Sequence, residues 1–176
     1  MASINIDAFD IVMSQFNQAN RYEMSRWDSS SRPVVVLGSL FDLGSFGQWL
    51  FDLSTKIFGP GTSVSDFAGV FWLSLISFSA KRAMVDEVLD TVSSREDVVV
   101  LWQLVRAHEL LFSRLDCFIT KCEAFCRYER SLSDHFVRYF LSSNGCLQDL
   151  EIWIRCCSVW IGEFDVRFLH LYPLAC

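Results

Sequence analysis

The residues of this chain that are best suited to chemistry are its cysteines and histidines. All seven cysteines fall in the last third of the chain, at Cys117, Cys122, Cys126, Cys146, Cys156, Cys157 and Cys176. The N-terminal stretch MASINIDAFD carries acidic residues and has no apolar run after a basic start, so it does not resemble a secretory signal. An odd number of cysteines without a signal peptide predicts free thiols in a reducing, intracellular compartment.

A metal site would require some of these thiols to converge. The candidate ligands are Cys122 and Cys126, which a helix places four residues apart on one face, together with His108. Structural zinc sites usually carry close pairs such as C-x₂-C on turns, and this spacing matches no such pattern. Because both cysteines lie on the apolar face of a predicted helix, we expect them in the core and predict no metal and no cofactor. A zinc-supported interaction module is the alternative.

Catalytic chemistry has no recognisable signature in this sequence. The chain contains no G-x-S-x-G, Walker, G-x-G-x-x-G or H-E-x-x-H motif, so the common hydrolase and nucleotide-binding patterns are absent. His108 falls on the apolar face of a predicted helix, where a buried histidine hydrogen-bonded to a neighbour is the commoner outcome. We therefore predict that the protein is not an enzyme, and we assign no catalytic residues.

The charge of the chain disfavours general binding to phosphate backbones. The net charge is −6 and the isoelectric point is near 5.0. The basic residues between positions 106 and 138 are interleaved with acidic ones, which is typical of a solvated helix face. The alternative is an oligomeric nucleic-acid-binding accessory protein of viral type, such as a suppressor of host defence, whose basic residues gather on one surface after assembly.

Length and composition predict a single folded domain over residues 1–176. The chain is 52% hydrophobic and 20% charged, so it has enough apolar surface to offset the entropy of ordering, and global disorder is excluded. Apolar residues recur at helical spacing in most of the chain. The predicted class is all-α, a single-domain irregular helical bundle around a central apolar helix. Helices are predicted over 6–27, 34–37, 45–58 and 66–92, from a capping box at 93–96 to 126, and over 146–161, with a further helix start at 131–134.

The predicted central helix begins after Gly59-Pro60-Gly61, with Ser65 as its N-cap. Residues 66–80 are apolar on nearly all sides, which predicts that other helices pack all around them. Only about 14 residues separate Asp66 from Lys81, too few to span a bilayer, so we predict no transmembrane segment. Two segments are ambiguous: 34–37 is β-branched but is predicted as a short helix, and 163–172 fits either a short strand or a final helical turn.

The 16 Phe and 6 Trp are more than one small core easily hides, so we expect some of them on an interaction surface. The candidates for partner contact are Trp49, Phe58, Phe112, Phe118, Phe125, Trp153 and Trp160. Between 101 and 126, apolar residues recur in steps of four and three and form a stripe along the predicted helix. Such a stripe would suit a coiled-coil dimer, but its width favours a bundle helix that touches two neighbours.

Two segments resemble the Bcl-2-like family of helical bundles. Residues 57–61 followed by 66–82 resemble the turn and core helix of its first homology region, and 160–164 resembles its second. The resemblance covers about a quarter of the chain. It implies a bundle with an apolar groove for a protein partner. The Asn-Trp-Gly-Arg signature of the family is missing, so the partner-binding arginine has no counterpart and no binding residue is transferred.

These observations predict a non-enzymatic regulatory or accessory protein. It would act by protein–protein interaction, either through an apolar groove or through a self-association face that makes a homo-oligomer. A compact helical chain without familiar motifs is also typical of small virus-encoded accessory proteins. The expected location is the cytoplasm, or the host cytoplasm or nucleus for a viral protein.

Overall fold

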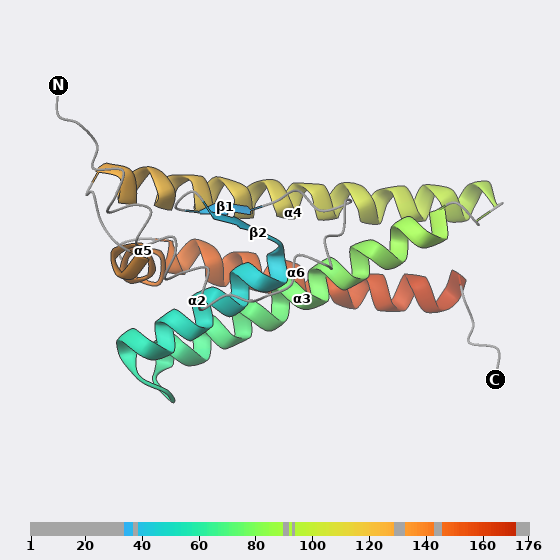
Figure 1. Cartoon of the computed structure of the whole chain (residues 1–176). Coiled ribbons are helices and arrows are strands. Elements are labelled where there is room, and N and C mark those ends of the chain that lie inside the picture. Colours follow the sequence, from blue (N-terminus) through green and yellow to red (C-terminus); the bar gives the residue numbers. More distant parts are fainter. Residues whose placement is uncertain are drawn as a thin grey trace, which may run out of the picture.

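The computed structural model describes residues 34–36, 39–89, 92, 94–128, 133–142 and 146–171, and these form a helical bundle with one short hairpin (Figure 1). The predicted all-α class is confirmed. The helix predicted over 6–27 and the residues after 171 lie outside the described part. The described elements are β1 (Val34–Val36), β2 (Ser39–Phe41), α2 (Leu43–Phe58), α3 (Ser63–Leu89), α4 (Arg95–Tyr128), α5 (Ser133–Phe140) and α6 (Leu147–Leu171).

The helix predicted at 34–37 is wrong, because this segment begins with a strand. β1 pairs antiparallel with β2, with Val34 opposite Phe41 and Val36 opposite Ser39. The partner strand follows almost directly in the sequence. Three consecutive β-branched residues suit this pairing. β1 also contacts α4, and the ring of Phe41 is buried against Trp49 of α2.

α2 and α3 form a helical hairpin that was predicted correctly at its turn. The Asp42 side chain caps α2 by accepting a hydrogen bond from the Ser45 amide at 2.7 Å. Gly59 and Gly61 end the helix with φ of 93° and 69°, a left-handed conformation that favours glycine. Ser65 is not the N-cap. Thr62 and Ser65 instead accept each other's amide hydrogen bonds, so α3 begins at a capping box three residues earlier.

The prediction that other helices surround α3 is wrong for one of its faces. α3 contacts α2, α4 and α6 through its buried residues Ala68, Phe71, Leu75, Phe78 and Val85. The opposite face reaches the surface, where Leu73 is 64% exposed. Three neighbouring helices cover only part of the circumference of a helix, so an apolar residue on the remaining side stays in water. By length and composition alone, α3 is also the one described helix able to cross a membrane, a test that core helices of soluble proteins also pass.

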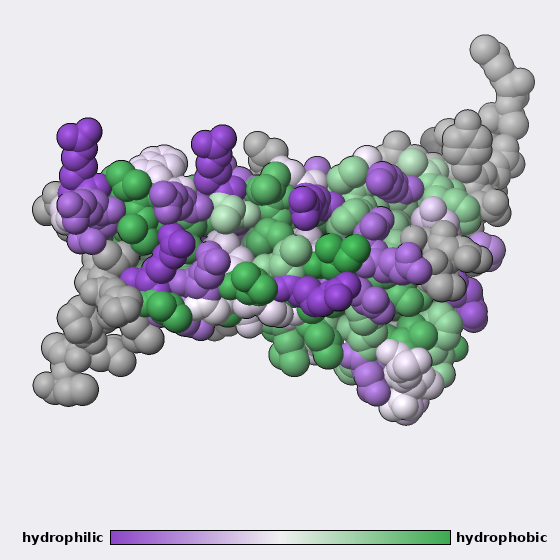
Figure 2. Space-filling view, turned by 180° about the vertical axis from the view of Figure 1, so that it is seen from behind, coloured by the Kyte–Doolittle hydropathy of each residue, from purple (hydrophilic) through white to green (hydrophobic). Residues whose placement is uncertain are grey.

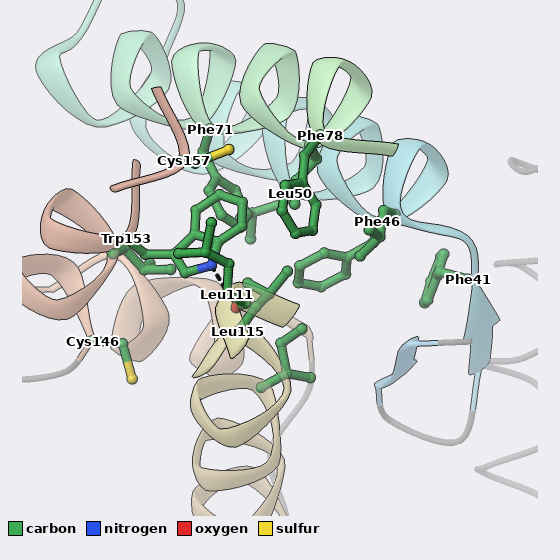
Figure 3. Packing of buried hydrophobic residues seen from close by; sticks show 14 of the residues in the cluster. Phe41, Phe46, Leu50, Phe71, Phe78, Leu111, Leu115, Cys146, Trp153 and Cys157 are labelled. Carbon is green, nitrogen blue, oxygen red and sulfur yellow. Dashed lines mark hydrogen bonds between the residues drawn. The ribbon is translucent and has the colours of Figure 1, made fainter. Parts of the chain in front are cut away.

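α4 and α6 pack antiparallel (Figure 1), and two tryptophans fix their register; Figure 3 shows the first of them, Trp153, beside Leu111. The Trp153 indole donates a hydrogen bond to the Leu111 carbonyl at 2.8 Å. One heptad further along α6, the Trp160 indole donates to the Leu104 carbonyl at 3.1 Å, one heptad back along α4. Each indole N–H is thus satisfied inside the core. α4 also contacts α3, which confirms a bundle helix with more than one neighbour.

α5 closes one end of the core with aromatic rings. Phe136 and Phe140 are fully buried, and they lie against Trp49 and Phe46 of α2 at ring distances of 5.6 and 6.1 Å. At the other end of the bundle α6 remains helical to Leu171, so the strand alternative is wrong over the described residues 163–171. Phe164 and Phe168, four residues apart, stack at 4.8 Å, a contact that a helix makes and an extended strand does not.

We expect Gly47→Ala to destabilise the protein by about 1–3 kcal/mol. A Cβ at position 47 would lie 2.7 Å from Cδ1 and 3.0 Å from Cα of Trp72, so α2 and α3 would have to separate. This cost exceeds the gain in helix propensity of about 1 kcal/mol. Gly162→Ala is the matched control, because nothing lies within 4 Å of a Cβ there. Thermal melts should show a lower Tm for the first variant and an unchanged or higher Tm for the second; equal shifts would contradict the close packing.

Candidate interaction surface

The exposed side of α3 carries a continuous stripe at the spacing of a helix–helix contact. The residues of this stripe follow one another in alternating steps of four and three along the sequence. We call the stripe the α3 seam. It consists of Asp66, Val70, Leu73, Ser77, Ala80, Met84 and Glu87. Val70 is 52% exposed, Leu73 64% and Met84 37%, and the neighbouring Ile76 is 43% exposed. This is the a/d pattern that a second helix recognises.

The rest of the bundle holds the α3 seam outward. On one side α2 packs against α3 through the stacked rings of Phe51 and Trp72, whose centroids are 5.7 Å apart. On the other side Lys81 pairs with Asp165 of α6 and lies 5.0 Å from the ring centre of Phe164. These contacts leave α3 no freedom to rotate its apolar stripe inward without breaking both interfaces.

The stretch of the α3 seam from Val70 to Ala80 differs from other exposed apolar residues by its lack of charge. Between Phe67 and Ala80 the sequence contains no charged residue at all. Exposed apolar residues on α4 and α6, by contrast, stand among charged ones; these are Val99, Trp102, Leu110, Ile152, Val159 and Val166. Figure 2 shows apolar side chains over the α2–α3 hairpin, at the lower right, with fewer hydrophilic groups than along α4. Apolar residues gathered on an uncharged stretch of one helix mark a contact surface more strongly than scattered residues do.

The seven aromatic residues predicted to contact a partner do not form a surface. Trp49, Trp153 and Trp160 are 7%, 1% and 4% exposed and belong to the core, so their assignment to an interaction surface is corrected. The other four, Phe58, Phe112, Phe118 and Phe125, are partly buried and pack against the core. Arg138 lies over the ring of Phe58, and Tyr139 stacks on Phe125. The aliphatic α3 seam was not predicted, because the only sign of it in the sequence is its heptad spacing.

The candidate metal ligands are not brought together in the described part of the chain. His108 and Cys122 lie 14 residues apart on α4, about 21 Å along the helix axis. The Cys126 side chain lies outside the described residues. Among the residues that are described, no group of three or more histidine, cysteine or acidic side chains has the arrangement of a metal site.

His108 is buried in a setting that keeps its ring neutral. Its imidazole stacks on Phe78 at 3.8 Å and lies against Trp160 at 5.4 Å. Burial, with a further contribution from Arg82, lowers the pKa of His108 from 6.5 to about 3. Its Nε2 atom has no hydrogen-bond partner, contrary to the expectation of a hydrogen-bonded core histidine. Such a ring is not able to exchange protons near neutral pH, and it serves as an aromatic core residue.

No protein-family model, curated protein or solved structure matches this chain.

Proposed function

We propose that this protein is a non-enzymatic interaction protein that binds an amphipathic helix of a partner protein along the α3 seam. The observation that carries this proposal is the exposure of Val70 and Leu73 on an uncharged helix face. Leaving large aliphatic side chains in water forgoes about 25 cal/mol for each Å² of apolar surface. A partner that covers them recovers this free energy.

The dimensions of the α3 seam suit one helix. From Val70 to Met84 it extends about 21 Å, which is about four helical turns. Ser77 and Ala80, in the middle, are small, so the backbone of a second helix can approach closely there. The larger Val70, Leu73 and Met84 on either side supply knobs for holes in the partner. This arrangement supports a helix rather than an extended peptide, which would need a free sheet edge.

The charges around the α3 seam favour a partner with basic flanks. Asp66 and Glu87 stand at its two ends and are exposed. The chain as a whole carries a net charge of −6. Lys81 and Arg82, the basic residues nearest the middle, form ion pairs with Asp165 and Asp86. A helix with an apolar stripe bounded by Lys or Arg would therefore be attracted and held in register.

The sequence resemblance to the Bcl-2-like family points to the same class of function, since it implies an apolar surface for a protein partner. The surface proposed here lies on the outer face of α3. An accessory protein that acts inside cells, including a virus-encoded one, would suit such a mode of binding. The described part of α4 favours a protein partner over nucleic acid, because its exposed Arg106, Arg114 and Lys121 are interrupted by exposed Glu109 and Asp116.

The proposal is tested with a synthetic helix that has Leu at its a and d positions and Lys on its flanks. We expect Leu73→Lys to weaken binding of this peptide by about tenfold or more, because a charge would be buried in the contact. Val159→Lys is the matched control: Val159 is also 64% exposed and gains the same charge, but lies on α6. Fluorescence anisotropy measures both affinities, and circular dichroism checks that both variants keep the wild-type helix content.

Three results with these variants would contradict a partner helix. Equal weakening by Leu73→Lys and Val159→Lys would mean that only net charge matters. A dimeric mass by light scattering that Leu73→Lys converts to a monomer would assign the α3 seam to a second copy of this chain. Flotation of the protein with neutral phosphatidylcholine vesicles, abolished by Leu73→Lys, would assign it to a lipid surface.

A further inference from the structure

Two thiols from distant parts of the chain meet in the core. Cys122 lies on α4 and Cys146 lies immediately before α6, and their sulfur atoms are 3.2 Å apart although they are separated by 24 residues in sequence. Cys122 is fully buried and Cys146 is 5% exposed. The pair follows the α4–α6 register that Trp153 and Trp160 set, since Cys146 stands one heptad before Trp153 (Figure 3). The contact is thus fixed by the packing of two long helices.

The surroundings of Cys146 favour its thiolate form. The Cys146 carbonyl accepts the amide hydrogen bond of Leu150 at 2.8 Å, so this residue stands at the N-terminus of α6, where the helix dipole stabilises negative charge. The hydrogen bond between the two sulfur atoms lowers the pKa of Cys146, and Lys121 lowers it further, against the opposing effects of burial and Asp149. By contrast, burial raises the pKa of Cys157 to about 12, so that thiol is not a nucleophile at neutral pH.

We infer that Cys122 and Cys146 form a redox-sensitive pair that a hydroperoxide converts to a disulfide. The Cys146 thiolate attacks one oxygen of hydrogen peroxide, which breaks the O–O bond and leaves a sulfenic acid at Cys146 and hydroxide. Cys122 then attacks that sulfur, the S–O bond breaks, and water leaves as the disulfide forms. In total, two thiols and one hydrogen peroxide give one disulfide and two waters. The sulfur atoms need to approach from 3.2 Å to about 2.05 Å, a shift within the reach of side-chain rotation.

The disulfide would fasten the end of the bundle that α5 closes. The segment between Cys122 and Cys146 contains α5, which buries Phe136 and Phe140 against α2. A covalent link across a loop of this length lowers the entropy of the unfolded chain. We therefore expect oxidation to raise the Tm of the full-length protein by about 5–10 °C, and dithiothreitol to reverse the change.

The test treats the full-length protein with hydrogen peroxide at pH 7, blocks remaining thiols with N-ethylmaleimide, and analyses non-reduced tryptic peptides by mass spectrometry. Cleavage after Arg138 and Arg155 leaves Cys146 as the only cysteine of its peptide. Cys122 shares its peptide with Cys126, so the experiment is repeated in a Cys126→Ala variant. The expected product joins the two peptides with the loss of two hydrogens.

Cys117 provides the matched control, because it lies on the same helix and is exposed. Cys117→Ala should keep both the cross-linked peptide and the rise in Tm, whereas Cys146→Ala should lose both. A Cys146 that ends as a stable sulfinic acid, pairs with a different cysteine, or is labelled by N-ethylmaleimide after peroxide treatment would overturn the inference. These readouts use the wild-type protein and the Cys126→Ala variant, so they decide the matter even if Cys146→Ala folds poorly.

Discussion

Replacing Trp153 by alanine is expected to lower the free energy of unfolding by about 3–5 kcal/mol. Trp153 is 1% exposed, and its ring packs edge-on against Phe71 and Phe78 at 5.6 and 5.5 Å (Figure 3). The substitution removes these contacts, leaves a cavity where α3, α4 and α6 meet, and removes the hydrogen bond to the Leu111 carbonyl. Because small domains are stable by only about 5–15 kcal/mol, this one change threatens the fold.

Two further variants separate the causes of that loss. Trp153→Phe keeps most of the apolar volume and loses the indole N–H, so it should cost less than the alanine variant, with about 1 kcal/mol from the missing hydrogen bond. Trp102→Ala is the control for removing a tryptophan, because Trp102 is 59% exposed on α4, and its effect should stay within about 0.5 kcal/mol. Urea denaturation measures all three. A similar loss for Trp102→Ala and Trp153→Ala would be inconsistent with this packing.

His108 should make the protein lose stability below pH 6.5. The unfolded chain binds a proton at His108 near pH 6.5, whereas the folded chain does so only near pH 3, because burial and Arg82 oppose the charged ring. Between these values the unfolded state holds more protons, so stability falls as the pH falls, by about 1.4 kcal/mol for each pH unit at most. Above pH 6.5 the ring is neutral in both states and contributes no pH dependence.

His108→Leu is the variant that tests this effect. It replaces a buried ring whose Nε2 has no hydrogen-bond partner with an apolar side chain, so stability at pH 7 should change little, apart from the loss of stacking on Phe78. Urea denaturation at pH 7, 6, 5 and 4 should show a smaller loss of stability for the variant than for the wild type. His135→Leu, at an exposed position on α5, is the control and should follow the wild type. Parallel curves for His108→Leu and wild type would refute the buried neutral histidine.

Local patterns were the best guides to the helices. The stop at Gly59-Pro60-Gly61 was predicted correctly because two of these residues adopt left-handed backbone that glycine favours. The face of α4 was also largely predicted, since Leu101, Val105 and Leu115 recur at helical spacing and are buried. At 34–37 the prediction failed, because the strand pair is only three residues long on each side and depends on its contact with α4.

The candidate interaction surface was less accessible to sequence reasoning than the fold. Large aromatic residues were expected at the surface, but Trp153 and Trp160 find hydrogen-bond acceptors on α4 and are therefore stable in the core. Leu73 and Val70 were expected inside, because a helix that is apolar on all sides is usually surrounded. Which side stays open depends on how many neighbouring helices reach it, and that number is not encoded in the segment itself.

The amino-acid sequence alone determined the helical class, the sharp end of α2 and the stripe that α4 buries, because these depend on backbone preferences and on residues three and four apart. Only the tertiary structure decided which face of α3 remains in water and which cysteines meet. Both depend on the antiparallel register of α4 and α6 and on the position of α2. Contacts between residues far apart in the chain are set by the packing of whole helices, and no local pattern contains that information.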